Sequence, residues 1–316
     1  MTKNNSATPK SRALQIISII IVILLCLACV GVTVWFYVFA NTPYEFSLDD
    51  YLSSATLVWN DEFDGNAVDL SKWNVEGANK SEGRTPRRGG YWSADSVRVD
   101  GGNLIIDITK RDDGFFYAGA VTTHDKYESK YGYYETRCQL PKNNGIWAAF
   151  WMMPVDIDGL FASGETNARV AGAEIDIFEG AFFPKSVVQQ NVHIGGYGTK
   201  HQSFPNVMAL FGDYGDIYDD FHTYGLYWDE NIYIFYIDGK RIWSTDCQNN
   251  VSQIDSAIYL TTEVGGYVKD GVPVPGTSWG DHKSPDCSEN DWSKNDVRFL
   301  VDYVRHYKNG NGNGNV

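Results

Sequence analysis

Residues 174–179 read Glu-Ile-Asp-Ile-Phe-Glu, and this stretch places three carboxylates among side chains that favour β-strands. Successive side chains of a strand alternate between its faces, so Glu174 and Asp176 share one face while Ile175 lies on the other. Glu179 would point into the apolar side of a regular strand. A single β-bulge between Asp176 and Glu179 returns it to the acidic face. The sequence therefore predicts a bulged strand with all three carboxylates on one side.

The spacing of the two glutamates matches a particular chemistry. With the bulge, their Cα atoms are four regular steps apart, roughly 13 Å at 3.3 Å per residue. Side chains that lean toward one another reduce this gap to roughly 5 Å, the separation of nucleophile and acid/base in a retaining glycoside hydrolase. A solvated strand face is the alternative interpretation. It is disfavoured because like charges this close raise one another's pKa and destabilise the strand.

The rest of the chain from Leu57 onward consists of short runs with period-two or apolar character, broken by Gly, Asp and Asn. Asp238-Gly239 and Asp100-Gly101-Gly102 are hairpin-type turn signals. The pattern holds no long amphipathic helix. It predicts an all-β fold, most simply a two-sheet sandwich, in which residues 155–172 and 265–296 are long loops at the rim of a cleft.

The charge of the chain restricts its partners. The 316 residues carry a net charge of −14, and without the three basic residues of the N-terminal tail 23 lysines and arginines stand against 40 acidic residues, a net charge of −17. Such a surface argues against binding of nucleic acid or anionic lipid. It also repels sulfated or uronic polysaccharides unless a basic cleft compensates, so a neutral polysaccharide is favoured.

Residues 13–40 contain no charged side chain, and about 20 apolar residues suffice for a membrane-spanning helix. Basic residues precede the stretch and acidic residues follow it, which predicts a cytoplasmic N-terminus. A cleaved signal peptide, which would leave a secreted protein, is the alternative, but its apolar region has only about 7–15 residues. The predicted organisation is a cytoplasmic tail (1–12), a transmembrane signal anchor (13–40), a stalk (41–56), an extracytoplasmic domain (57–308) and a low-complexity, disordered tail (309–316).

Three cysteines lie outside the predicted anchor. Cys247 and Cys287 are in polar, loop-like contexts that allow one disulfide between them, whereas Cys138 is in a strand-like run typical of a buried thiol. Spacing alone does not decide the pairing.

The hexapeptide 174–179 resembles the E-I-D-x-x-E signature of glycoside hydrolase family 16 in its bulged form, which is typical of laminarinase-like endo-1,3-β-glucanases, agarases and carrageenases. Further segments are similar to the family in the same order and extend the resemblance over nearly all of residues 57–308. They are Trp59–Gly65 with Leu70–Trp73, Gly145–Pro154, Phe221–Trp228 with Tyr236–Gly239, and Val301–Arg305. The resemblance implies a concanavalin-like β-jelly-roll sandwich with a sugar cleft across the concave sheet.

The same resemblance implies roles for the three carboxylates. Glu174 would be the nucleophile that forms a glycosyl-enzyme, and Glu179 the acid/base that protonates the leaving oxygen and then activates water. Asp176 would hydrogen-bond Glu174 and set the charge state of the group. No cofactor is required for this chemistry.

Four further residues are candidates for substrate binding. Trp147 and Trp151 are four positions apart and share a strand face, where an indole either stacks on sugar or packs into the core. The resemblance favours Trp147 in the cleft and, more loosely, Trp92. His193 stands where the family often has a cleft histidine, although a lone histidine is more often structural.

Asp302 resembles, together with Glu62 and a carbonyl of Gly101 or Gly102, the structural calcium position of several family members. The alternative is an ordinary surface carboxylate. A structural Ca²⁺ at Asp302 is therefore an expectation that the structure can test.

Two departures from the family pattern bear on the substrate: Ser96 stands where many members have Asn, and residues 180–184 are not the usual laminarinase continuation. The leading expectation is a monomeric, membrane-anchored, retaining endo-glycosidase of β-1,3 or mixed β-1,3/1,4 glucan. The alternatives are an agarase- or carrageenase-type galactan hydrolase and a transglycosylase that uses the same carboxylates. A carbohydrate-binding module without activity is the non-enzymatic alternative, and it predicts a lost carboxylate, whereas all three are present.

Overall fold

The computed structural model describes residues 45–143, 145–180, 187–209, 217–276, 278–279, 282–283, 287, 290–294 and 297–310. The predicted cytoplasmic tail and signal anchor lie outside these residues, as does most of the predicted C-terminal tail. Among the described residues no helix has the length and apolar character to span a membrane. The chain divides into two units, residues 1–50 and 51–316, and the described part of the first contains the start of helix α2 (Leu48–Ser54).

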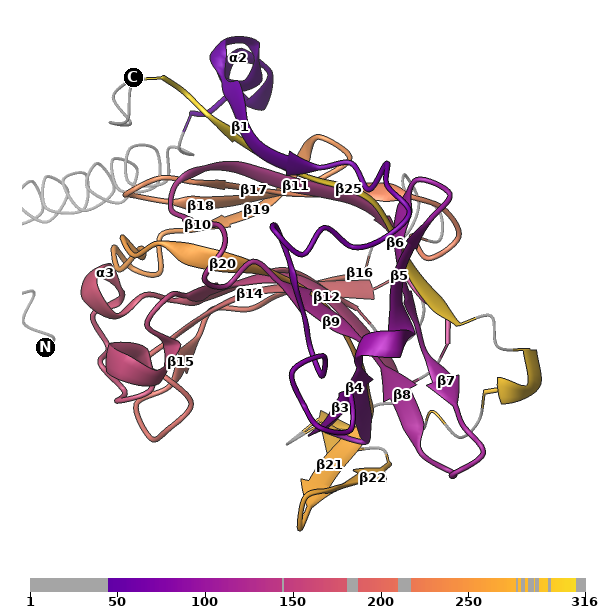
Figure 1. Ribbon diagram of the computed structural model, residues 1–316. Helices are drawn as coiled ribbons and strands as arrows, with labels where there is room; N and C mark the ends of the chain where they lie inside the picture. The colour runs from indigo at the N-terminus through magenta and orange to yellow at the C-terminus, as the bar shows by residue number, and fades with distance from the viewer. Residues whose placement is uncertain are drawn as a thin grey trace, which may run out of the picture. The chain divides into compact units, whose positions relative to one another are not determined.

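Two antiparallel sheets face one another in the second unit (Figure 1). One has eight strands in the order β19 (Lys240–Thr245), β18 (Tyr233–Ile237), β17 (His222–Trp228), β11 (Gly132–Gln139), β25 (Arg298–Lys308), β6 (Asn103–Asp107) and β5 (Val97–Asp100), with β1 (Thr56–Asp61) beside β25. The other has nine in the order β15 (Gln202–Ser203), β14 (Val187–Ile194), β13 (Glu174–Gly180), β12 (Ile146–Pro154), β20 (Ser256–Val264), β9 (Ala120–Thr122) and β2 (Asn74–Val75), with β10 (Glu128–Ser129) beside β20 and β16 (Asn206–Ala209) beside β14.

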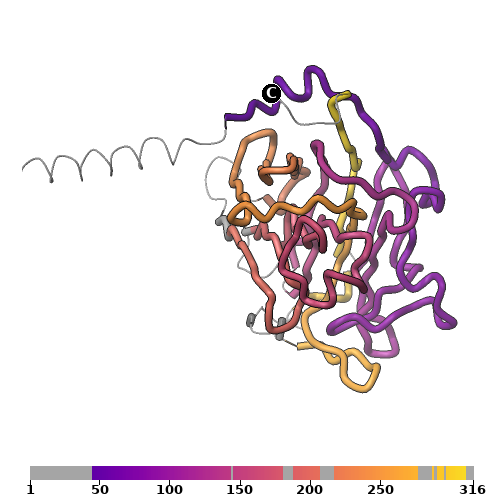
Figure 2. Tube along the Cα trace, turned by 90° about the vertical axis from the view of Figure 1, so that its left-hand side faces the viewer, coloured from indigo at the N-terminus to yellow at the C-terminus, as the bar shows by residue number. Residues whose placement is uncertain are grey.

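Smaller elements complete the described fold. They are a four-stranded sheet of β3 (Arg84–Arg87), β4 (Gly90–Ser93), β8 (Phe116–Ala118) and β7 (Thr109–Lys110), the hairpins β21 (Gly266–Lys269) with β22 (Val272–Pro275) and β23 (Ser278–Trp279) with β24 (His282–Lys283), helix α3 (Ala168–Ala171), and the short turns η1 (Ala94–Ser96), η2 (Ile157–Phe161) and η4 (Trp292–Lys294). Part of the segment expected as a loop over 265–296 is thus hairpin. In Figure 2, β25 runs beside strands from the start of the unit, so residues far apart in sequence lie side by side.

The core lies between the two sheets and confirms the all-β sandwich. Phe178 of β13 packs against Tyr224 of β17 and Phe299 of β25, with ring centroids 4.3 Å and 6.2 Å apart. All three side chains are fully buried. Because each strand alternates between faces, the same strands leave their other face free for polar residues.

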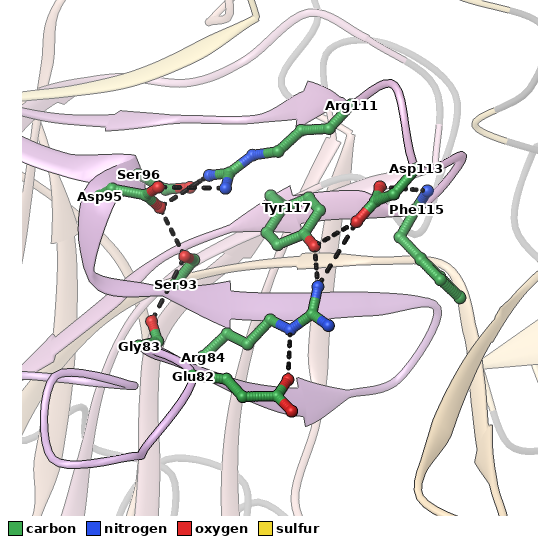
Figure 3. A network of polar contacts seen from close by, with 10 residues as sticks. All are labelled: Glu82, Gly83, Arg84, Ser93, Asp95, Ser96, Arg111, Asp113, Phe115 and Tyr117. Carbon is green, nitrogen blue, oxygen red and sulfur yellow. Dashed lines mark hydrogen bonds and ion pairs between the residues drawn. The ribbon is translucent and has the colours of Figure 1, made fainter.

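A network of ion pairs holds the four-stranded sheet (Figure 3). Arg84 of β3 bonds the hydroxyl of Tyr117 and pairs with Asp113 at 3.4 Å. Arg111 donates to both carboxylate oxygens of Asp95 at 3.0 and 2.7 Å, and its guanidinium lies 3.7 Å from the Tyr117 ring centroid. Each arginine of this network is paired with an aspartate. We infer that the network stabilises the small sheet, in which β3 carries Arg87 and β4 carries Trp92, two residues of the candidate site.

The disulfide that the sequence allows between Cys247 and Cys287 is not formed. Both residues are buried thiols, Cys247 in the core between the large sheets and Cys287 in a separate cluster with Ile146 and Val264. The hydrophobic packing that buries each of them keeps them in different parts of the fold. Cys138 is a buried thiol, as its strand pattern predicts.

Candidate active site

The predicted bulge is present in β13. Asp176 lies opposite Asn191 of β14, whereas Glu179 lies opposite Gln189, so three steps on β13 match two on β14. The register with β12 shifts at the same place, between its residues 150 and 151. The extra residue brings Glu179 back to the face that carries Asp176, as the alternation argument requires.

The two residues inside the bulge both turn toward the core. Ile177 and Phe178 have no exposed surface, although neighbours on a regular strand would face opposite ways. On the other side of the strand, Asp176 is 2% exposed and Glu179 is 8% exposed. The site therefore consists of nearly buried carboxylates on a strand whose other face is fixed by packing.

The predicted tryptophans of β12 share the face of these carboxylates. Trp147 lies opposite Glu263 of β20, and Trp151 lies opposite Tyr259 on one side and Asp176 on the other. The Trp151 indole donates to the Thr261 hydroxyl at 3.0 Å, and its ring centroid is 4.5 Å from that of Tyr259. Trp151 is thereby held within the floor beside the carboxylates.

His193 lies directly across from Glu174 on β14. Its Nε2 atom is 3.3 Å from Asp176 Oδ2 and 3.9 Å from Glu174 Oε1. The structure thus brings the predicted histidine into contact with two of the three predicted carboxylates. Tyr197, in the loop after β14, donates its hydroxyl to Glu174 and is 63% exposed.

Two arginines border the other end of this face. Arg87 and Arg88 each donate to a different oxygen of Glu263, which is 5% exposed. The Arg87 guanidinium lies 4.7 Å from the Trp92 ring centroid, and that of Arg88 lies 4.6 Å from the Trp147 centroid. Two guanidinium groups for one carboxylate leave a net positive charge beside the two tryptophans. The Trp92 indole is oriented by its bond to the Thr262 carbonyl at 2.8 Å.

The electrostatics of the carboxylates follow from burial and from one another. Burial raises the pKa of both Glu174 and Glu179, and the charge of Asp176 raises both further. The charge of Glu263 also raises the pKa of both glutamates. The charges of His193 and Arg87 act against the rise at Glu174, whereas at Glu179 the charge of Glu174 adds to the rise and that of Arg88 opposes it. Glu179 is consequently the group that holds its proton more strongly.

The calcium position expected at Asp302 does not fit the residues found there. Asp302 pairs with Arg137 at 2.7 Å, and Glu62 receives two bonds from Arg305 at 2.9 and 2.7 Å. Each carboxylate is paired with a guanidinium, whose positive charge opposes binding of Ca²⁺ at these two side chains. The resemblance to the family does not predict that Arg137 pairs with Asp302 or that Arg305 pairs with Glu62.

Sequence reasoning missed several residues of this face: Arg87, Arg88, Tyr197, His201 and Glu263. Weak sequence signals existed for three of them. Arg87-Arg88 is a basic doublet in an acidic chain, and Tyr197 stands within the glycine-rich run Gly195-Gly196-Tyr197-Gly198. These residues contact parts of the site that are distant in sequence, so no strand or helix periodicity predicts the contacts.

Known proteins resemble this chain over most of its length. A family model described as "Beta-porphyranase A-D, GH16 domain" matches residues 57–309. Glucan endo-1,3-beta-glucosidase A1 of Niallia circulans is 29% identical over 82% of this chain, which spans 39% of that protein. Glucan endo-1,3-beta-glucosidase of Cryptopygus antarcticus is 28% identical over 79% of this chain and 91% of its own length.

Solved structures agree with this assignment. The catalytic domain of an endo-1,3-beta-glucanase (laminarinase) from Thermotoga petrophila superposes with a TM-score of 0.60 and 27% identity, over 81% of this chain and 99% of that one. The family model covers four-fifths of the 316 residues and includes the bulged strand and both large sheets. The chain belongs to glycoside hydrolase family 16 and is a glycoside hydrolase.

Proposed function

We propose that the domain is a retaining, endo-acting glycoside hydrolase that cleaves β-1,3 or mixed β-1,3/1,4 glucan. The observation that carries the proposal is the bulge of β13, because it turns Glu174 and Glu179 to one face of the strand, and double displacement needs two carboxylates on the same side of the sugar chain. The names of the glucan-cleaving relatives support the substrate class.

In the proposed mechanism Glu174 attacks the anomeric carbon while Glu179 donates its proton to the leaving glycosidic oxygen. The resulting glycosyl-enzyme is hydrolysed when Glu179, now a carboxylate, takes a proton from water and the new hydroxide bonds to the anomeric carbon, which releases Glu174. The hydroxyl of Tyr197 donates to Glu174 and holds it in place. The raised pKa of Glu179 suits a group that must carry a proton at the first step.

The floor and walls of the site suit a neutral sugar chain. Trp147 and Trp92 offer indole surface, and we propose that they stack on sugar rings, with Trp151 and His193 beside the bond that is cleaved. The acidic net charge of the chain, −14, also favours an uncharged polysaccharide.

A second candidate is a galactan hydrolase, which one observation favours. The Arg87–Arg88 pair gives this end of the site a local positive charge, which is the compensation that a sulfated chain would need. The description of the matching family model points the same way. We rank it second because both guanidinium groups are already bonded to Glu263.

We also propose that residues 13–40 anchor a monomeric enzyme in a membrane with its catalytic domain outside the cytoplasm. The support is the uncharged stretch and the basic residues before it. Recovery of the full chain in membrane fractions, with the domain accessible to external protease in intact cells, tests this proposal. A chain shortened by removal of residues 1–40 and found in the medium would instead indicate secretion.

The substrate test uses the full chain with laminarin, lichenan, agarose, porphyran and carrageenan, and Glu174→Gln as the matched inactive control. We expect large oligosaccharide products from laminarin or lichenan, with the β-anomer formed first in NMR spectra. An initial α-anomer would overturn double displacement. Hydrolysis of porphyran alone would replace the first candidate by the second.

A further inference from the structure

A second histidine stands behind His193. His201, in the loop between β14 and β15, places its Nε2 atom 2.7 Å from His193 Nδ1. The two rings are stacked, with centroids 4.9 Å apart and planes inclined by 15°. His193 therefore has one nitrogen on the carboxylates of β13 and the other on His201.

The hydrogen-bonding partners restrict where the protons lie. Ionised carboxylates only accept, so the Nε2 atom of His193 that faces Asp176 carries a hydrogen. Between the two imidazoles at 2.7 Å one nitrogen donates and the other accepts. If His193 is an imidazolium, its Nδ1–H donates to a bare Nε2 of His201. Both rings charged would set two N–H groups against one another.

The surrounding charges favour the arrangement in which His193 is the imidazolium and His201 is neutral. Burial lowers the pKa of His193, but its bond with Asp176 and the charges of Asp176 and Glu174 outweigh burial, so the pKa is raised overall. Burial and the charge of His193 lower the pKa of His201. The phenol of Tyr197 also lies near the pair: it bonds Glu174, and its ring centroid is 6.1 Å from that of His201.

The loop that presents His201 is tightly built. Gly195 and Gly196 have φ of 79° and 62°, a region that other residues rarely adopt. A Cβ atom at Gly195 would lie 2.6 Å from the Lys200 carbonyl oxygen, and one at Gly196 would lie 2.5 Å from that of Phe161. Backbone thus blocks both positions, and the turn holds His201 in front of His193.

We propose that His201 is a positioning residue that accepts the Nδ1–H of His193 and so keeps one positive charge directed at Asp176 and Glu174. That charge favours the ionised form of Glu174, the form that attacks the anomeric carbon. This last consequence rests on the function proposed above, whereas the proton arrangement does not.

The test compares His201→Phe, which keeps a stacking ring but no acceptor, with His201→Gln, whose side-chain carbonyl restores the acceptor. His124→Phe, which changes a half-buried histidine in the turn between β9 and β10, is the matched control. Nitrogen-15 NMR of the full chain, labelled at its 6 histidines, reports the charge of His193 at each pH, with His193→Gln to assign its signals.

We expect His201→Phe to lower the pKa of His193 by about one unit, the loss of one ordinary hydrogen bond to a charged group. Loss of the positive charge raises the pKa of Glu174, so the acidic limb of kcat/KM moves to higher pH, and activity on that limb falls about tenfold. His201→Gln should recover most of both effects, and His124→Phe should show neither.

Unchanged His193 signals and an unchanged acidic limb in His201→Phe would overturn the proposal. Equal losses in His201→Gln and His201→Phe would also overturn it, because they would assign the effect to ring packing. If the wild-type chain hydrolyses no polysaccharide tested, the proposed function fails, and the nitrogen-15 spectra still decide whether His201 accepts from His193.

Discussion

Substitution of Glu263 by Gln tests whether the arginine-bound carboxylate tunes the proposed acid/base. Glu263 lies opposite Trp147, and Glu179 lies opposite Ala149 one strand further on. Two strand spacings of about 4.8 Å and two residues of about 3.3 Å place their Cα atoms about 12 Å apart. At an effective dielectric constant of about 20, two unit charges at about 12 Å interact by about 1.4 kcal/mol, or about one pKa unit, and full water screening reduces this about fourfold.

The sign follows from the charge that is removed. Glu263 raises the pKa of Glu179, so Glu263→Gln lowers it, and the released guanidinium groups of Arg87 and Arg88 act in the same direction. Because the acid must be protonated, the alkaline limb of kcat/KM should move to lower pH by up to about one unit. The acidic limb should move less, since Glu174 is further along the strand.

Stability should fall as well. Removal of one partner from a buried ion pair costs about 3–5 kcal/mol, and the partly exposed arginines place this case near 3 kcal/mol. Urea denaturation measures it. Glu62→Gln is the matched control, because it breaks the Arg305 pair on the other sheet and should lower stability without moving either limb. An alkaline limb that stays in place or moves upward in Glu263→Gln would refute the electrostatic reasoning.

Three further predictions address other parts of the molecule. Tyr197→Phe removes a donor to Glu174, so the acidic limb should move to higher pH and kcat should fall about fivefold to tenfold in a pH series; an unchanged limb would contradict this. Phe178→Ala should lower the free energy of unfolding by about 3–5 kcal/mol in urea, because it empties a fully buried site; a loss under 1 kcal/mol would show that the core collapses around it. Burial lowers the pKa of His306 to about 3 from its ordinary 6.5, so the folded state resists protonation and stability is lost as pH falls through this window, by up to about 1.4 kcal/mol per unit. His306→Gln should lack that slope when unfolding is compared at pH 7 and pH 4.5, and an equal slope would assign it to other groups.

The predictions from sequence succeeded where the cause is local. Strand alternation depends on neighbours in the chain, so the bulge between Asp176 and Glu179 could be inferred from six residues. The shared face of Trp147 and Trp151 follows from the same period of two. These arguments need no knowledge of which strands pair.

The predictions failed or were silent where partners come from distant segments. Arg87 and Glu263 are 176 residues apart, and no spacing rule links them. The arginine partner of Asp302 could not be foreseen either, because Arg137, which pairs with that carboxylate, lies 165 residues earlier. The state of Cys247 and Cys287 was left open for the same reason, since burial in separate clusters depends on how the sheets pack.

The bulge joins the stability of the fold to the chemistry of the site. Nearly buried carboxylates at Asp176 and Glu179 destabilise the folded state, because burial and mutual repulsion both disfavour their charge. In a regular strand only one of Ile177 and Phe178 would face the core, whereas the bulge buries both, and each fully buried side chain contributes about 1.5–3 kcal/mol. The same extra residue therefore aligns the carboxylates and adds apolar burial that offsets their cost. A variant without the bulge would lose the alignment of the carboxylates and the apolar burial together. Substitutions that keep the bulge, such as Glu174→Gln, therefore test the catalytic role of a carboxylate without changing the core.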